Sequence, residues 1–234
     1  MAKQADLIGF LFEGQPHLLS DELLQWMESS PRFTGFVDTF RDKIRKKIRT
    51  ALNPESALDL RAELEVACCL LNDRRLAVAY EPYASAKRRG PDFAVTYRAN
   101  LVFNLEVARF RAEESRQASR IEVRILRILL GKLGQMQPGM ANLLVFHTRA
   151  ELARSIDLPG LMQDVKTRVE GKDPTFYASG YAAGRYDGPA TFYKDFLRLS
   201  GILLWAPGAL PWVNKQARPA LDEKVLRLIG SLAG

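Results

Sequence analysis

The stretch GPDFAVTYRANLVFNLEVARFR, from Gly90 to Arg111, decides the fold of this chain. Two apolar runs with alternating side chains flank the connection 97–100, and the first run opens with Asp92. Alternation with a period of two predicts two strands, and the short connection predicts that they form a hairpin. Glu106 lies near the end of the second strand, so the stretch holds two acids that the hairpin could bring together.

The side chains of each predicted strand divide between two faces. Asp92 shares one face of its strand with Thr96, and Glu106 shares one face of the next strand with Asn104 and Ala108. If the register brings these faces together, the two carboxylates converge and repel each other unless a divalent cation lies between them. Hard oxygen ligands suit Mg²⁺ or Mn²⁺. We therefore expect a metal site here; otherwise the two acids simply mark the edges of a hairpin.

A helix before these strands could add a third acid. It is predicted to start at Ser56, after the Asn53-Pro54 break, and to run to about residue 73 with a stripe of apolar residues. Glu63 stands at the border of that stripe and Glu65 projects away from it. Glu63 is therefore the predicted third acid.

Hydrophobic periodicity predicts the remaining elements. Residues 18–52 are predicted to form two helices, and RLAVAYEPY (75–83) a strand that precedes the hairpin. A helix over 112–134, the strands NLLVFHT (142–148) and GILLWAP (201–207), and a closing helix over 221–232 follow, whereas 172–199 carries no clear pattern. The order helix, three strands, helix, strand predicts an α/β layered domain with a mixed sheet.

The composition narrows the class of protein. The chain has 234 residues and a net charge of +7, which favours an acidic partner such as nucleic acid. No apolar run approaches the ~20 residues that cross a bilayer, and the N-terminus does not resemble a signal peptide, so we expect a cytoplasmic protein without a membrane partner. The adjacent Cys68 and Cys69, with His17 and His147, give neither a disulfide framework nor a zinc spacing.

Basic residues gather at three places. The loop Lys87-Arg88-Arg89 and the helix ridge that contains Arg116, Arg120, Arg124 and Arg127 are predicted to contact nucleic-acid phosphates. The helix around Ile44 also carries six Lys and Arg residues between 41 and 49. That helix is interpreted as a solvated polar face, with phosphate contact as the alternative.

A Glu on a helix, a strand that opens with Pro-Asp and a second strand with Glu-x-Lys form the signature of the PD-(D/E)XK, or restriction-endonuclease-like, nuclease superfamily. This sequence resembles that signature in AELEVACCLL (62–71), in Pro91-Asp92 and in LEVA (105–108), over about residues 61–132. The resemblance implies a three-layer α/β core with a central mixed sheet flanked by helices, in residues 56–234. Residues 1–55 would be an N-terminal helical extension packed on that core as part of one structural unit.

The resemblance also implies an activity and a site. The implied activity is hydrolysis of DNA phosphodiester bonds with Mg²⁺ or Mn²⁺ as cofactor, so the expected nucleic-acid partner is DNA rather than RNA. Asp92 and Glu106 would be catalytic and would hold the metal, with the Val107 carbonyl as a further ligand. Glu63 would be the catalytic acid on the helix, and Glu65 is the alternative.

The sequence departs from the signature at Ala108, where the superfamily has a Lys that orients the attacking water and stabilises charge on the phosphate. Arg109 points to the opposite face of the strand. Arg111, Arg116 or Arg120 could instead reach in from the following helix. The sequence therefore indicates either a nuclease with a degenerate site or a catalytically inactive protein of the same fold that binds nucleic acid or a protein partner. A third hypothesis is an interaction protein whose basic helix around Ile44 docks on an acidic partner or a membrane surface.

Overall fold

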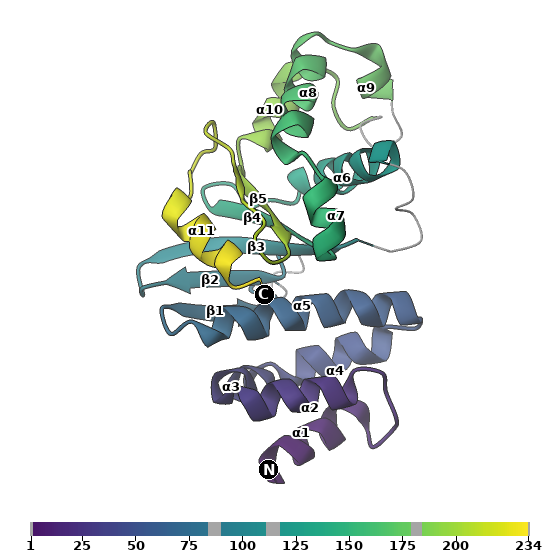
Figure 1. Cartoon of the computed structure of the whole chain (residues 1–234), viewed down its shortest axis with the longest axis vertical. Helices are drawn as coiled ribbons and strands as arrows, with labels where there is room; N and C mark the ends of the chain where they lie inside the picture. Colours follow the sequence, from purple (N-terminus) through teal and green to yellow (C-terminus); the bar gives the residue numbers. More distant parts are fainter. Residues whose placement is uncertain (1, 84–89, 111–117, 179–183, 234) are drawn as a thin grey trace. The chain divides into compact units, whose positions relative to one another are not determined.

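The structure is a computed structural model that describes residues 2–83, 90–110, 118–178 and 184–233, without the side chains of 2 and 118–120. Figure 1 shows its helices and strands in chain order. Its internal contacts divide the chain into two units: Met1–Tyr80 with Val95–Leu101, and Glu81–Ala94 with Val102–Gly234. The predicted boundary between residues 55 and 56 falls inside the first unit and stays a prediction.

The first unit begins with four short helices, α1 (Ala2–Phe12), α2 (Ser20–Ser29), α3 (Pro31–Thr39) and α4 (Arg41–Thr50). The prediction of two helices over 18–52 was wrong, because the second predicted helix is divided at Phe40 into α3 and α4. The Thr39 hydroxyl donates to the Gly35 carbonyl at 2.8 Å, a local bond that competes with regular helix geometry. Phe40 takes a non-helical φ of −108° and ψ of 17°, and its ring packs against Tyr80 with centroids 6.2 Å apart.

Helix α5 (Pro54–Asn72) packs against α3, α4 and β1 (Leu76–Tyr80) within the same unit. Its start follows from the sequence: the Asn53 side chain accepts from the Ser56 N–H at 2.8 Å, and Pro54 occupies the first turn. The predicted apolar stripe is confirmed, since every residue in it is buried (Leu60, Leu64, Ala67, Cys68 and Leu71).

Six strands form one mixed sheet in the order β1-β2-β3-β4-β5-β6, flanked by helices. They include β2 (Phe93–Tyr97), β3 (Leu101–Arg109), β4 (Ala141–His147), β5 (Leu199–Trp205) and β6 (Trp212–Val213). β3 runs parallel to β4 and β4 parallel to β5, whereas β5 and β6 are antiparallel. The predicted order helix, three strands, helix, strand is confirmed as α5-β1-β2-β3-α6-β4, where α6 is Ala118–Leu133.

The connection between β2 and β3 confirms the predicted tight turn. Arg98 and Ala99 have positive φ angles of 48° and 66°, the pair of conformations that a type I′ hairpin turn requires.

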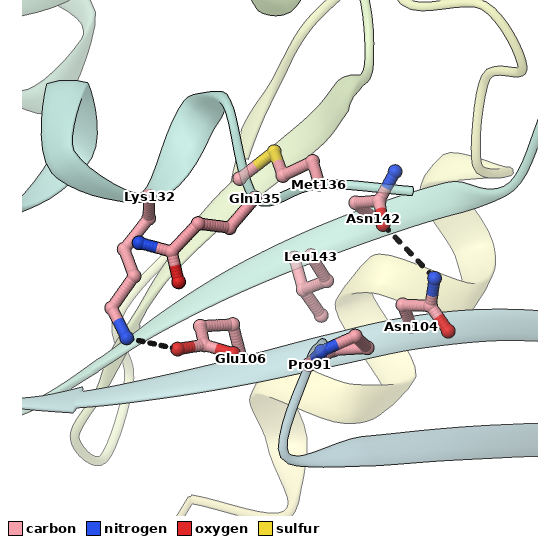
Figure 2. Close-up of a pocket in the computed structure, with 8 residues that line it drawn as sticks. All are labelled: Pro91, Asn104, Glu106, Lys132, Gln135, Met136, Asn142 and Leu143. Carbon is pink, nitrogen blue, oxygen red and sulfur yellow. Dashed lines mark hydrogen bonds and ion pairs between the residues drawn. The ribbon is translucent and has the colours of Figure 1, made fainter. Parts of the chain in front are cut away.

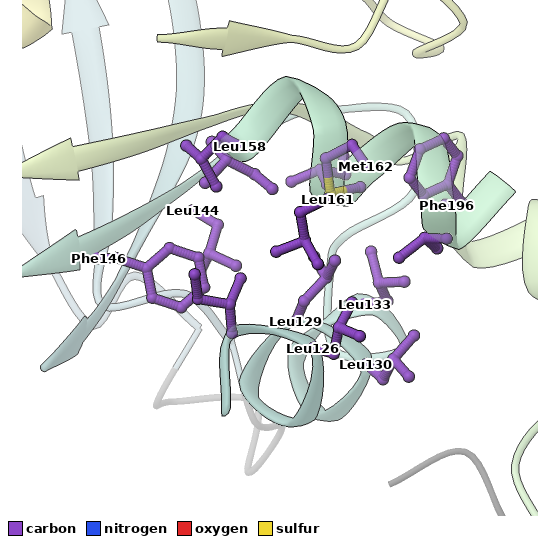
Figure 3. Packing of buried hydrophobic residues seen from close by; sticks show 14 of the residues in the cluster. Leu126, Leu129, Leu130, Leu133, Leu144, Phe146, Leu158, Leu161, Met162 and Phe196 are labelled. Atoms are coloured by element: carbon purple, nitrogen blue, oxygen red, sulfur yellow. The ribbon is translucent and has the colours of Figure 1, made fainter. Parts of the chain in front are cut away.

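The second unit buries a large apolar cluster. The cluster lies between strands β4 and β5 on one side and a group of helices on the other, and Figure 3 shows part of it. The helices after β4 are α7 (Ala150–Ser155), α8 (Leu158–Glu170), α9 (Pro174–Ala178), α10 (Pro189–Phe196) and α11 (Glu223–Ser231). Ile202 and Leu204 of β5 belong to the cluster, whereas α11 covers the other face of β5 at Gly201 and Leu203. Burial on both faces explains why every residue of β5 is apolar or small.

Among the described residues, no helix is both long and apolar enough to cross a membrane.

Candidate active site

Asp92 is fixed at the start of β2 by two hydrogen bonds within the second unit. Its carbonyl accepts from the Glu81 N–H at 2.7 Å, and its carboxylate oxygen Oδ2 accepts from the Val107 N–H at 2.8 Å. Pro91, which is buried, fixes the backbone just before it. The side chain of Asp92 therefore reaches the backbone of β3 at Val107, the residue that follows Glu106 in the chain. The convergence of the two carboxylates on one metal ion stays a prediction.

The carboxylate of Glu106 forms an ion pair with the ammonium group of Lys132, in the last turn of α6. The Glu106 side chain is 14% exposed and that of Lys132 is 31% exposed, so the carboxylate is the better shielded partner. Ala108, two residues further along the same face of β3, packs against the apolar cluster beneath the helices. Position 108 thus contributes to the core, and the cation at Glu106 comes from the helix rather than from the strand.

A small pocket opens beside this ion pair, and Figure 2 shows its lining. Its free volume is about 10 Å³, close to the minimum that holds one water molecule. Pro91, Leu143 and Met136 form apolar walls, and the remaining lining residues are polar: Asn104, Glu106, Lys132, Gln135 and Asn142.

The floor of the pocket is a buried pair of asparagines on neighbouring strands. Asn104 donates from Nδ2 to Oδ1 of Asn142 at 3.0 Å, and Tyr83 donates its hydroxyl to Asn104 at 3.4 Å. The Nδ2 group of Asn142 in turn donates to main-chain carbonyls, among them that of Met140 at 2.7 Å. Because a buried amide is costly unless its polar atoms are bonded, this network holds β3 and β4 in one register below Glu106.

Glu63 lies in the first unit, where its carboxylate oxygen Oε2 accepts from Lys47 Nζ at 2.6 Å and from the Tyr80 hydroxyl at 2.7 Å. The Lys47 ammonium also lies 4.9 Å from the centre of the Tyr80 ring. Glu65, the alternative helix acid, accepts from Arg61 at 2.8 Å. Each acid therefore has a partner inside its own unit, and the role of Glu63 as a third site acid stays a prediction.

Most of the predicted nucleic-acid contacts lie outside the described part of the chain: Lys87, Arg88, Arg89 and Arg116, together with the side chain of Arg120. Arg124 is described, and its guanidinium lies 5.6 Å from the centre of the Phe110 ring. Its Nε and Nη1 atoms are buried. Arg124 is half-buried and Arg127 is exposed, and phosphate contact by the ridge stays a prediction.

The donor set of the site can be compared with what metals require. Within the described residues, no group of three or more His, Cys, Asp or Glu side chains could hold a metal ion. Mg²⁺ is usually bound through one or two carboxylates and keeps several waters, so Asp92 and Glu106 supply a fitting set, whereas zinc prefers nitrogen and sulfur. The Val107 carbonyl leaves β3 by the same edge as its N–H, on the side of Asp92.

Lys132 is the site residue that the motif did not reveal. It is the single Lys in the predicted helix 112–134, and it follows Ile125 and Leu129 at helical spacing on the buried face. A cation that continues an apolar stripe is the signal that could have identified it.

The search for relatives found no family model, no curated protein and no solved structure that matches the chain. The assignment of the site rests on the contacts of Asp92, Glu106 and Lys132.

Proposed function

We propose that this chain is a divalent-metal-dependent nuclease that hydrolyses DNA phosphodiester bonds with a PD-(D/E)XK-like, restriction-endonuclease-like core. One observation carries the proposal: the Asp92 carboxylate bonds to β3 at Val107, next to Glu106, and Glu106 holds the ammonium of Lys132. Two carboxylates and one cation at the same strand are the groups that phosphodiester hydrolysis with a metal ion needs.

The order of elements supports the proposal. Helix α5 precedes both acids, and helix α6 follows them, as the resemblance over about residues 61–132 implies. The Pro-Asp pair comes directly before β2, and the Glu lies in the second half of β3.

Each residue would have a distinct role in the reaction. Asp92 and Glu106, with the Val107 carbonyl, would hold Mg²⁺ or Mn²⁺ and orient it toward the phosphate. A bound ion of this kind lowers the pKa of a coordinated water and offsets negative charge on the phosphate. Lys132 would hold its positive charge beside the reacting phosphate, the role that Ala108 cannot perform.

A second function is favoured by one feature of the same site. Lys132 already engages the Glu106 carboxylate, and the pocket beside the pair has a free volume of only about 10 Å³. A site closed in this way fits a protein of the same fold that binds nucleic acid or a protein partner without cutting.

The test is cleavage of supercoiled plasmid and of a labelled DNA duplex with Mg²⁺ or Mn²⁺, compared with EDTA. Asp92→Asn and Glu106→Gln are expected to reduce the rate by roughly 100-fold or more, and Lys132→Met by roughly 100-fold, as for loss of one preorganised electrostatic contact. Glu122→Gln on α6, the helix of Lys132, and Lys224→Met on α11 are the controls, because both residues are exposed and neither belongs to the proposed site or to the predicted phosphate contacts. Both control variants should cut at the wild-type rate.

The outcomes separate the two functions. Metal-dependent cutting that only the three site variants lose supports the nuclease. DNA binding without cutting by the wild-type chain would select the second function. Cutting that persists unchanged in all the variants would come from a contaminating nuclease and would contradict the proposed site.

A further inference from the structure

The second unit contains a groove that the proposed nuclease site does not use. It has a volume of about 570 Å³ and is formed by α7, the start of α8, the end of β5 and the segment 206–212. Its lining is mostly apolar and includes Ile156, Leu158, Leu204, Leu210 and Trp212. Small-molecule sites in proteins are concave, largely apolar and about 300–1,000 Å³ in volume, so the groove has the size and character of such a site.

The floor of the groove is part of the folded core. Leu158 and Leu204 are 2% and 3% exposed and belong to the main apolar cluster. Trp212 pairs with Ile202 across β5 and β6, and its ring lies 6.2 Å from that of Phe196. These contacts hold the floor in place before any ligand arrives, which lowers the entropic cost of binding.

The rim combines an exposed apolar side chain with one positive charge. Leu210 is 81% exposed, although large apolar side chains are usually covered. Arg154 also lines the groove and is exposed, and it forms no ion pair or side-chain hydrogen bond with the part of the chain that the structure describes. The carboxylate of Asp157 is bonded to the Gly160 N–H at 3.0 Å, where it caps α8. Arg154 is therefore the charge at this rim that a ligand can neutralise.

We propose that this groove binds a small amphipathic anion, with an aromatic or aliphatic body and one carboxylate, sulfonate or phosphate group. The body lies on Trp212, Leu204 and Leu158, where apolar surface leaves water. The anionic group pairs with the Arg154 guanidinium, which offers donors in a planar fork. A neutral ligand gains only the first interaction, and a fully polar one would desolvate the groove without compensation.

Two fluorescent probes test the proposal directly. Anilinonaphthalene sulfonate carries one sulfonate on an aromatic body, and N-phenyl-1-naphthylamine is its uncharged analogue. We expect the full chain to bind the sulfonate more tightly than the amine. Arg154→Gln should weaken sulfonate binding roughly three- to tenfold, in the range of one exposed charge-assisted contact, and leave binding of the amine unchanged.

Two further variants place the effect in the groove. Arg149→Gln removes an equal charge from an exposed residue just before α7 that does not line the groove, and it should bind both probes as the wild type does. Ala209→Trp fills the groove from its lining and should weaken both probes, provided that its thermal melt shows a folded chain.

Three results would overturn the proposal. The first is equal affinity for the two probes in the wild type. The second is an equal loss in Arg154→Gln and Arg149→Gln, which would indicate a general charge effect. The third is concentration-dependent dimerisation in sedimentation velocity that Ala209→Trp abolishes, which would assign the groove to a second copy of the chain.

Discussion

At the scale of single residues, the cation of the candidate site lies on a helix, while position 108 of the strand packs on the core. Ala108 packs against the apolar cluster, and a Lys at that position would have to bring its ammonium out of a core of Leu, Ile and Phe side chains. Lys132 stands in the last turn of α6, where the helix dipole favours positive charge. Its ammonium meets the Glu106 carboxylate at the edge of the core, where the charge is compensated.

The adjacent cysteines lead to a prediction about reactivity. Burial raises the pKa of the Cys69 thiol to about 11 and that of Cys68 to about 12, with smaller contributions from nearby groups that include Glu65. Because the thiolate is the reactive form, Cys69 should react with a disulfide reagent at pH 8 about 100-fold more slowly than a free thiol, and Cys68 more slowly still. The measurement is the release of thionitrobenzoate by the folded chain, compared with the chain in guanidinium chloride.

The same shifts set a direction for stability. The folded-state pKa of each thiol lies above its unfolded value, so the protonated thiols stabilise the folded state fully below about pH 8. This contribution is lost as the pH rises toward 11 and 12. Between pH 8 and 10, the free energy of unfolding should therefore fall less in the double variant Cys68→Ala/Cys69→Ala than in the wild type. Fast reaction of both thiols in the folded chain would contradict the burial on which both expectations rest.

At the scale of elements, patterns within one segment predicted most of the core, and contacts between segments decided the rest. The β2–β3 hairpin and α5 follow from alternation, turn residues and an Asn-Pro cap, all of which are local. The break at Phe40 depends on Tyr80, forty residues later, and β6 is only Trp212–Val213 paired with β5. The candidate site follows the same division. Alternation along the strands singled out Asp92 and Glu106 as candidate site residues, whereas Lys132 meets Glu106 only through the contact between α6 and β3.

Strand β5 offers a test of this close packing. A Cβ atom on Gly201 would lie 2.9 Å from the Trp212 carbonyl oxygen and 3.3 Å from the Leu226 side chain, so β6 would have to shift and the Leu226 side chain would have to move slightly. Gly201→Ala should lower the free energy of unfolding by about 1–3 kcal/mol, the usual cost of overpacking. Urea denaturation followed by circular dichroism measures the change.

Gly131→Ala is the matched control in the same unit. Gly131 lies inside α6, and a Cβ atom there would meet nothing within 4 Å. The added methyl group should raise stability by roughly 0.5–1 kcal/mol, because Ala is the better helix former. If Gly201→Ala does not lower the free energy of unfolding, or if both variants change it equally, then β6 and α11 do not pack against Gly201 as described.

At the scale of the whole molecule, the net charge is +7, and some of the basic residues form ion pairs with acids. On α4, two acids offset part of the positive charge: Glu13, just after α1, pairs with Arg45 at 2.8 Å, and Asp38 of α3 pairs with Arg41 at 3.6 Å. Lys47 forms an ion pair with Glu63 at 2.6 Å. These pairs support the interpretation of α4 as a solvated, partly neutralised face, and phosphate contact by the loop 87–89 stays a prediction.

The salt dependence of DNA binding separates these two basic segments. If Lys87, Arg88 and Arg89 each neutralise one phosphate, replacing all three with Ala should reduce the slope of log K against log salt concentration by about 2.7, since each contact contributes about 0.9. Fluorescence anisotropy of a labelled duplex at several salt concentrations gives the slope. The triple variant with Ala at 41, 46 and 49 removes the same charge from exposed positions of α4 and should leave the slope unchanged. Equal reductions in both variants would mean that DNA senses only the total charge, and a larger reduction in the α4 variant would move the phosphate contact to that helix.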